Sequence, residues 1–279
     1  MDKIIYPCIM CKNNAKEMAE YYLSVFTDIE IADENNWAVV LNIVGQRVML
    51  LNGGEMAHPN PTISLMYLTT SAFEVQDLYN KLIKGGKDLM PLDSYPFSEK
   101  YAWVEDRYNV SWQIITANEK DIIQKIVPTL MFVGENNGKA AEAIDFYTSK
   151  FPNSEKLGVL KYTGDEGEIP GNIQHAEFKM LDYLLMIMDS SNLNSINFSE
   201  GVSLVVECKT QEEIDKYWDI FISNGGEEGM CGWLKDKFGI CWQIAPSVLK
   251  ELLKKSPEVM KEMINMKKLD IRRLSDSVM

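Results

Sequence analysis

The chain has 279 residues, a typical length for two domains, and its apolar content of 46% is ample for packed cores. A net charge of −13 argues against a nucleic-acid partner and against anionic membrane surfaces, because both require an excess of Lys and Arg on one face. No apolar run of 18 residues occurs, and the start MDKIIYPCIM does not resemble a signal peptide, so we expect a soluble cytoplasmic protein with no membrane partner.

The first half of the chain predicts two successive units, each with a strand, a helix and further strands. Apolar residues recur at helical spacing in 15–26 and in 75–83, and Gly85-Gly86 ends the second helix because glycine accepts the left-handed conformation. We expect the strands at 4–10, in a hairpin over 39–52 that turns near Gly45, at 63–68, and in a closing hairpin that includes 103–114.

The first strand contains Cys8 and Cys11, two of the five cysteines, at a spacing found in redox and zinc motifs. No second pair of this kind and no His pair completes a four-ligand zinc site. Residues three apart in a strand point to opposite faces. We therefore expect buried structural thiols in a reducing compartment.

The second half repeats the first. The segment WVEDRYNVSWQI (103–114) returns as WLKDKFGICWQI (233–244), and the earlier strands and helix return at 125–131, 140–151, 176–189 and 202–207. Thr210 with Glu213 predicts a capping box at the start of the next helix. Four βαβββ-like units predict an α+β fold of curved, mostly antiparallel sheets, with helices on the convex side and a concave side that can enclose a ligand.

This repeat divides the chain into two predicted domains, at 1–118 and 127–246, with a linker at 119–126. A tail at 247–279 follows the second domain and has no counterpart in the first half. Pro257 divides the tail into two short predicted helices. We expect the tail to dock on the second domain or on a contact between the domains.

Several segments together carry a family resemblance, although none is decisive alone: PTLMF, AAEAIDFYTSKFPNSE, VSLVVECKTQEEIDKYWD, GGEEGMCGWLKDKFGICWQIAPSVL and MKKLDI. They resemble the PhnB-like branch of the glyoxalase/bleomycin resistance/dioxygenase (vicinal oxygen chelate) superfamily, often labelled 3-demethylubiquinone-9 3-methyltransferase. The resemblance covers both halves and implies duplicated domains in which two βαβββ units line one open barrel that holds the ligand. Units of two superfamily domains commonly complete each barrel, which implies a pseudo-symmetric monomer or, alternatively, a homodimer through the tail.

The superfamily's usual metal site takes one His, Gln or Glu from each of four strands. To within a residue, the matching positions of this chain are Tyr6, Leu50, Thr62 and Gln113 in the first half and Val127, Ile187, Gly201 and Gln243 in the second. A divalent ion needs several oxygen or imidazole donors, and only the two glutamines offer a weak one. The resemblance therefore predicts a chain without the family's metal, and no cofactor is expected.

The methyltransferase label finds no support in the residues. An enzyme that uses S-adenosylmethionine usually has a glycine-rich turn after a first parallel strand, and this chain contains no GxG. The βαβαβ order of alternating parallel strands is also missing from the predicted elements.

The WQI strands contain the first candidate ligand contacts. The resemblance points Gln113 and Gln243 into the barrel, where each either contacts a ligand or only satisfies its neighbours. Trp103 and Trp233, on the preceding strand, can stack a planar or cationic ligand or pack in the core. Tyr6, at a former metal position, is a further candidate ligand contact. Asp106 and Asp236 begin turns and are expected to be structural.

The segment His175-Ala176-Glu177-Phe178-Lys179 concentrates polar side chains on one strand. A period of two puts His175, Glu177 and Lys179 on one face. If the other face meets the helices, these three look into the cavity, and His175 beside Glu177 can act as a general base. A solvated or salt-bridged strand face is the alternative. The loop 161–172 is either a lid over that cavity or a plain hairpin loop.

Three functions stay open, and the sequence does not decide whether the chain is an enzyme. The favoured one is a metal-free protein that binds an unidentified small molecule in one or two apolar pockets and tolerates cationic or neutral ligands better than anions. The second is an isomerase, lyase or dioxygenase with His175 and Glu177 as catalytic residues. The third is a structural role in which Met and Trp side chains fill both cavities.

Overall fold

The structure, a computed structural model, describes residues 4–54, 58–165, 167–193 and 195–278. Four units of one strand, one helix and three strands follow one another along the chain. The first unit contains β1 (Ile5–Cys11), α1 (Ala15–Val25), β2 (Ile29–Glu34), β3 (Ala38–Ile43) and β4 (Gln46–Asn52). The second contains β5 (Ile63–Thr69), α2 (Ala72–Leu82), β6 (Lys87–Tyr95), β7 (Ser98–Glu105) and β8 (Ser111–Thr116).

The units of the second half have the same order. The third contains β9 (Ile126–Phe132), α3 (Ala140–Lys150), β10 (Glu155–Lys161), β11 (Ile173–Met180) and β12 (Tyr183–Asp189). The fourth contains β13 (Val202–Cys208), α4 (Gln211–Ile222), β14 (Glu227–Glu228), β15 (Trp233–Lys235) and β16 (Cys241–Pro246). Two short 3-10 helices, η1 (Glu119–Asp121) and η2 (Gly134–Asn136), precede and follow β9.

Local hydrogen bonds explain where the second helix of each half begins and ends. Ser71 and Thr210 cap α2 and α4 through side-chain oxygens, which accept from backbone N–H groups three residues later at 3.2 and 3.3 Å. Both helices end before a glycine with positive φ, 82° at Gly85 and 98° at Gly225. The predicted capping box is half formed, because the Glu213 carboxylate accepts from the N–H of the residue before Thr210.

The duplicated twelve-residue segment forms a buried turn that ties the last hairpin of each half to a helix. One oxygen of Asp106 accepts from the Tyr22 hydroxyl at 2.8 Å and from the Trp112 indole at 3.2 Å. Its other oxygen accepts from two backbone N–H groups of the turn. Asp236 makes the same four contacts in the second half. The structural role expected for both aspartates is therefore confirmed.

The sixteen strands of the described chain form two eight-stranded mixed sheets, and each sheet takes one unit from each half. Sheet A has the order β14-β15-β16-β13-β1-β4-β3-β2, and sheet B has the order β10-β11-β12-β9-β5-β8-β7-β6. The antiparallel pairs β1 with β13 and β5 with β9 join the halves. The predicted α+β class of curved, mostly antiparallel sheets is confirmed. The two units of one half do not share a sheet; the other half completes each one.

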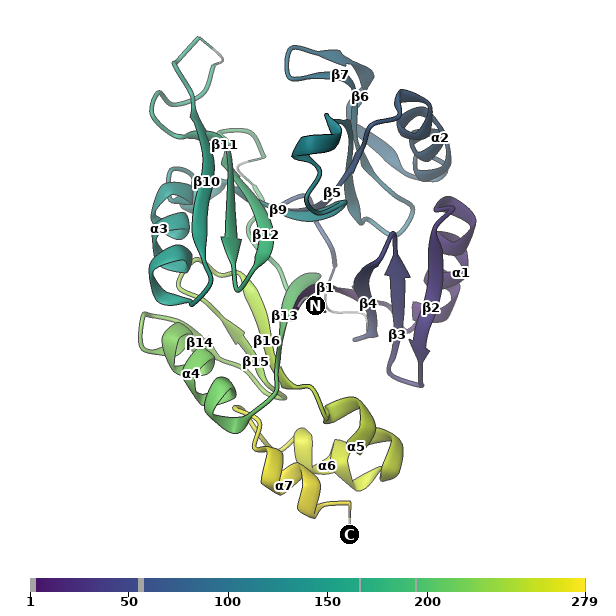
Figure 1. The fold of residues 1–279 in the computed structure, drawn as a ribbon, viewed down its shortest axis with the longest axis vertical. Helices are drawn as coiled ribbons and strands as arrows, with labels where there is room; N and C mark the ends of the chain where they lie inside the picture. The colour runs from purple at the N-terminus through teal and green to yellow at the C-terminus, as the bar shows by residue number, and fades with distance from the viewer. Residues whose placement is uncertain (1–3, 55–57, 166, 194, 279) are drawn as a thin grey trace.

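The hydrophobic cores follow the halves instead. Helices α1 and α2 share one core, in which the ring of Phe26 lies 5.1 Å from that of Trp112. Helices α3 and α4 share a second core, in which Phe151 and Phe221 are 5.0 Å apart. Figure 1 shows the two helix pairs on opposite flanks of the molecule. Each half thus supplies most of one core, while the sheets run from one half into the other.

The tail contains three helices, α5 (Leu249–Lys255), α6 (Glu258–Met263) and α7 (Ile271–Asp276), so the prediction of two was wrong. The third begins at Asp270, whose side chain accepts from the N–H of Arg273. The helices share a small core and lie at one end of the molecule (Figure 1). Among the described residues, no helix is both long and apolar enough to cross a membrane.

The tail docks on the second half, as expected, and also reaches the first. The Gln211 side chain at the start of α4 donates to the carbonyl of Leu269 at 3.1 Å and accepts from the N–H of Ile271 at 2.9 Å. From α5, Lys250 and Lys254 form ion pairs with Asp33 on β2 at 3.4 and 2.9 Å. The tail therefore links the two edge regions of sheet A.

Candidate ligand-binding site

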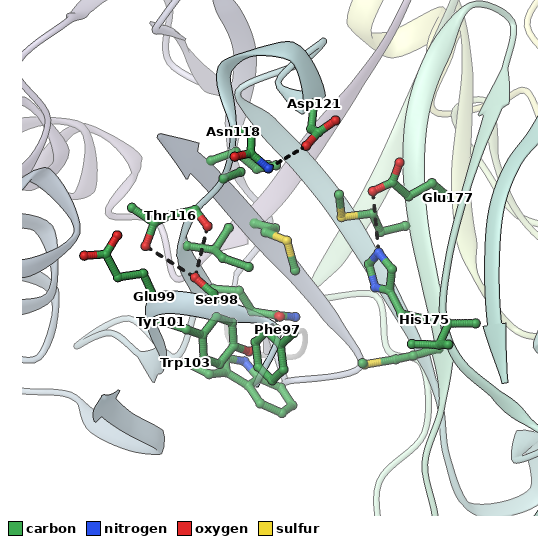
Figure 2. A pocket seen from close by; sticks show the side chains of 18 of the residues that line it. Phe97, Ser98, Glu99, Tyr101, Trp103, Thr116, Asn118, Asp121, His175 and Glu177 are labelled. Atoms are coloured by element: carbon green, nitrogen blue, oxygen red, sulfur yellow. Dashed lines mark hydrogen bonds and ion pairs between the residues drawn. The ribbon is translucent and has the colours of Figure 1, made fainter. Parts of the chain in front are cut away.

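A cavity of about 840 Å³ lies on the concave side of sheet B. Its walls come from both halves: β7 and β8 of the second unit face β11 and β12 of the third (Figure 2). The linker between the halves, through Asn118, Glu119 and Asp121, forms part of the rim. The pairing of units across the halves therefore creates this cavity.

One wall of this cavity is aromatic. Figure 2 shows Phe97, Tyr101 and Trp103 together on the side of β7. The Phe97 ring stands edge-on to the Tyr101 ring at 5.1 Å, and the Trp103 indole donates to the Ser111 hydroxyl at 2.6 Å. Tyr101 and Trp103 share one face of β7, and that face looks into the cavity.

The floor holds Gln113 in a fixed orientation. Its side-chain oxygen accepts from the Tyr101 hydroxyl at 2.8 Å, and its nitrogen donates to Ser64 at 2.7 Å. Gln113 lines the cavity and is only 3% exposed, and both ends of its amide are already occupied. Thr129 lies opposite Ser64 in the register, and its hydroxyl oxygen is buried without a partner. The floor thus keeps one hydrogen-bonding position unfilled.

His175 and Glu177 face the aromatic wall from β11 (Figure 2). Their Nε2 and Oε1 atoms lie 3.6 Å apart, close enough for an ion pair when the imidazole is protonated but too far for a hydrogen bond. Both side chains are about a third exposed, at 35% and 38%. The third residue of that strand face, Lys179, lies outside the cavity lining and pairs with Glu155 on β10 at 2.8 Å.

The loop 161–172 connects β10 to β11 and contributes Tyr162 to the cavity lining at its base. The Glu168 carboxylate accepts from Ser190 at 2.9 Å and from the N–H of Ser191 at 2.7 Å, which ties the loop to the segment after β12. Among the residues that the structure describes, this segment is a hairpin loop beside the cavity.

Sheet A has the same Gln–Ser hydrogen bond as the cavity floor of sheet B, but its neighbouring residues differ. Gln243 donates to Ser203 at 2.9 Å, as Gln113 does to Ser64. Cys8 replaces Thr129 in the register, and burial raises the pKa of its thiol to about 12, so the thiol stays protonated. The description of Cys8 and Cys11 as buried free thiols is confirmed.

The concave side of sheet A carries a charged cluster where sheet B is apolar. The Arg47 guanidinium lies 4.3 Å from the ring centre of Tyr6 and pairs with Glu207 at 2.6 Å. The sheet registers put Val127, Leu184 and Leu68 at the corresponding positions of sheet B. Tyr6 therefore packs under an arginine, away from the cavity that contains Gln113. Trp233 borders a smaller cavity of about 330 Å³ near β14.

The donors of neither sheet fit the metal that the fold family implies. On sheet B, the inward positions at the centre of β5, β8, β9 and β12 are Ser64, Gln113, Thr129 and Met186. Ile187, which the sequence placed here, packs instead in the core beside α3. Within the described residues, no three His, Cys, Asp or Glu side chains converge. Hydroxyl, amide and thioether groups are weak ligands for a divalent ion, and the one amide is already used.

Comparison with known families decides the membership of this chain. The sequence profile of the family described as 3-demethylubiquinone-9 3-methyltransferase matches residues 3–115 and 124–245, which is most of both halves. The chain belongs to this family. No functionally curated protein matches the sequence.

Solved structures show the same fold. Glyoxalase I from Zea mays aligns with a TM-score of 0.60 at 11% identity, over 89% of this chain and 93% of that one. A Bacillus subtilis protein provisionally described as a dioxygenase aligns over 98% of this chain and 95% of its own length, at 10% identity and a TM-score of 0.53. A PhnB protein from Bacillus cereus is 29% identical over 39% of this chain and 96% of its own, with a TM-score of 0.36. At these identities the full-length likenesses establish the glyoxalase-type fold alone.

Sequence reasoning left an inward position of Trp103, His175 and Glu177 as one of two alternatives and did not bring them together with Gln113, whereas all four line the cavity in the structure. They meet because β8 and β11 belong to one sheet. It missed Phe97 and the rim acids of the linker. The exposed aromatic beside Pro96 in the turn between β6 and β7 was the available clue for Phe97. The sequence offered no comparable clue for the linker acids, because the linker reaches the cavity only through the tertiary fold.

Proposed function

We propose that this member of the family is a metal-independent binding protein for a small organic molecule, with its site in the cavity of sheet B. The observation that carries the proposal is the cavity itself, about 840 Å³ in volume. Aromatic and methionine side chains surround a few fixed polar groups there, a composition typical of ligand pockets. Trp103 and Gln113 are the proposed contacts, while Tyr6 and Gln243 have structural roles in sheet A.

Metal independence is supported by the floor chemistry. A catalytic ion on this fold would need several strong donors converging on one point, whereas Ser64, Gln113 and Thr129 offer neutral oxygens and Met186 a thioether. The methyltransferase activity in the family name is not proposed. The sheets are mixed and curved, and the chain lacks the glycine-rich turn that follows the first strand of a dinucleotide-type fold.

An enzymatic role is the second candidate, and one observation favours it. His175 and Glu177 face the cavity on the wall opposite the aromatic group, with 3.6 Å between Nε2 and Oε1. A neutral imidazole beside a carboxylate can accept a proton from a ligand held between the walls. The role requires the same occupied cavity as the binding role and adds a chemical step to it.

A thermal-shift screen of small metabolites against wild type and two matched variants tests the binding proposal. Met188→Trp puts an indole into the cavity, and Leu51→Trp makes the same change at the corresponding position of sheet A. Compounds that stabilise wild type should bind Met188→Trp at least about tenfold more weakly, because the added ring occupies their space. They should bind Leu51→Trp as they bind wild type.

The same compounds should bind equally well after exhaustive treatment with a chelator, and elemental analysis of the purified protein should show no stoichiometric divalent ion. Loss of binding on chelation would contradict metal independence, and binding untouched by Met188→Trp would place the site elsewhere. Conversion of a bound compound by wild type but not by His175→Gln would favour the enzymatic role.

A further inference from the structure

The rim of the sheet B cavity carries carboxylates without matching cations. Glu99, Glu119, Asp121 and Glu177 line the cavity, and no Lys or Arg does. In the described part of the chain, Glu177 has only His175 at ion-pair distance, and Asp121 accepts from the Asn118 amide at 3.0 Å. Among the described residues, no Lys or Arg lies within ion-pair distance of any of these four carboxylates. The cavity mouth is therefore a region of uncompensated negative charge.

Several acidic groups elsewhere on the surface are paired with lysines. Asp33 meets two lysines of α5, Glu228 meets Lys267 at 3.0 Å, and Asp215 meets Lys268 at 3.0 Å. Low-dielectric walls around a mouth of one sign concentrate the field and raise the local concentration of oppositely charged molecules. The four rim carboxylates, in a cavity lining without Lys or Arg, therefore favour a positively charged ligand.

The aromatic wall is a second feature that favours a positively charged ligand. Phe97 is 60% exposed and is held by Tyr95, whose ring stacks on it at 5.5 Å, and by Tyr101 edge-on. Phe97 lines the cavity and is held in place by these neighbours, and the π face of an aromatic ring attracts cations. Among the described residues, the Thr129 hydroxyl, on the cavity side of β9 but beneath the cavity lining, is also buried without a hydrogen-bond partner.

We infer that the sheet B cavity takes an organic cation, a protonated amine or quaternary ammonium with an apolar body, and discriminates against anions. The apolar body lies along the Met and aromatic side chains, and the cationic group lies between the Phe97 wall and the rim carboxylates (Figure 2). This inference rests on the proposed binding function and specifies its ligand class.

Three probes of similar shape and different charge test it: phenyltrimethylammonium, its neutral isostere tert-butylbenzene, and benzenesulfonate. Ligand-observed NMR titration of the intact protein at low ionic strength gives all three affinities. The cation should bind about fivefold or more tightly than the neutral probe, since cation–π and carboxylate attraction act together. Benzenesulfonate should bind most weakly, and added salt should weaken only the cation's binding.

Matched variants locate the effect. The double change Glu99→Gln and Glu177→Gln should weaken the binding of phenyltrimethylammonium and leave the binding of tert-butylbenzene unchanged. The control Glu20→Gln, on an exposed face of α1, should change the affinity of neither probe. Phe97→Leu should weaken the binding of the cation several-fold. Its control is Phe73→Leu on α2, where the native side chain is 81% exposed, and this change should leave the binding unaltered. Phe97 and Phe73 are both exposed, so neither change threatens the core.

The outcomes separate the inference from the proposed function. Neutral binding equal to or tighter than cation binding overturns the charge inference and leaves a ligand site in place. Binding of none of the probes also overturns it, and the proposed function then stands or falls on the metabolite screen with Met188→Trp. Cation binding that survives both the glutamine and the Phe97→Leu changes overturns the assignment to this cavity.

Discussion

A single buried carboxyl in each half organises the repeated segment. Asp106 is 2% exposed and Asp236 3%, and each accepts four hydrogen bonds. Those donors favour the charged form, but burial outweighs them and raises the pKa of Asp106 to about 6 and that of Asp236 in the same direction. The repeated geometry of the turn therefore makes a pH-dependent contribution to the stability of the folded protein.

Asp106→Asn tests this contribution. A carboxyl whose folded-state pKa lies above its ordinary value holds its proton more tightly when folded. Its stabilising effect is therefore complete below about pH 4 and disappears as the pH rises through about 6. The unfolding free energy of wild type, relative to Asp106→Asn, should fall by up to about 3 kcal/mol between pH 4 and pH 7.

Urea denaturation at a series of pH values measures the difference, and only its pH slope is diagnostic, because an Asn amide facing the Trp112 indole also lowers stability at every pH. Glu20→Gln, an exposed acid, should show no such slope relative to wild type. A flat difference for Asp106→Asn would mean that the carboxyl titrates in its ordinary range.

At the level of elements, the sequence patterns did not predict the edge strands β2 and β10. All seven residues of β10 are exposed, including Val159 and Leu160, so neither apolar alternation nor a buried run marks the strand. The same holds for most of β2. Each is specified by backbone pairing with its neighbour, which an analysis of side-chain periodicity does not detect. Strands β9 and β13 were predicted because their runs are predominantly apolar.

The tail offers a contrast between two kinds of contact. The double change Lys250→Ala and Lys254→Ala removes the ion pairs to Asp33 and should cost less than about 1 kcal/mol, because exposed pairs are weak. Leu269→Ala removes a fully buried side chain and should cost about 2–4 kcal/mol locally.

Hydrogen exchange of the amides in α5–α7 reports both changes on the tail itself, with Lys255→Ala, an exposed change in the same helix, as control. Faster exchange throughout the tail is expected for Leu269→Ala alone. Equal acceleration by the lysine changes would show that Asp33, not apolar packing, anchors the tail.

At the scale of the whole molecule, two organising patterns cross. Apolar cores hold α1 with α2 and α3 with α4, whereas sheet hydrogen bonds hold the first unit to the fourth and the second to the third. Neither half can complete a concave sheet alone, and the sheet B cavity depends on both. The connection through 119–126 therefore adds little to the association of halves that two sheets already join.

Cleavage of the linker tests that arrangement in the intact protein. A site-specific protease sequence inserted at Ile123, which is 58% exposed, allows the folded chain to be cut between the predicted domains. The two fragments should elute together in native size-exclusion chromatography, because β1 pairs with β13 and β5 with β9 across the cut. They should separate in strong denaturant. Native separation would contradict sheet pairing across the halves.

The sequence by itself determined the repeat, the helices, the inward faces of the central strands and the loss of metal-binding side chains, because each of these depends on residue type and short-range spacing. Only the tertiary structure decided which units share a sheet, which strands line the sheet B cavity, and which acids meet at its rim. Strand pairing over more than a hundred residues leaves no local pattern. The contact of Tyr6, Arg47 and Glu207 likewise joins three strands that lie far apart in the sequence, and no spacing predicts it.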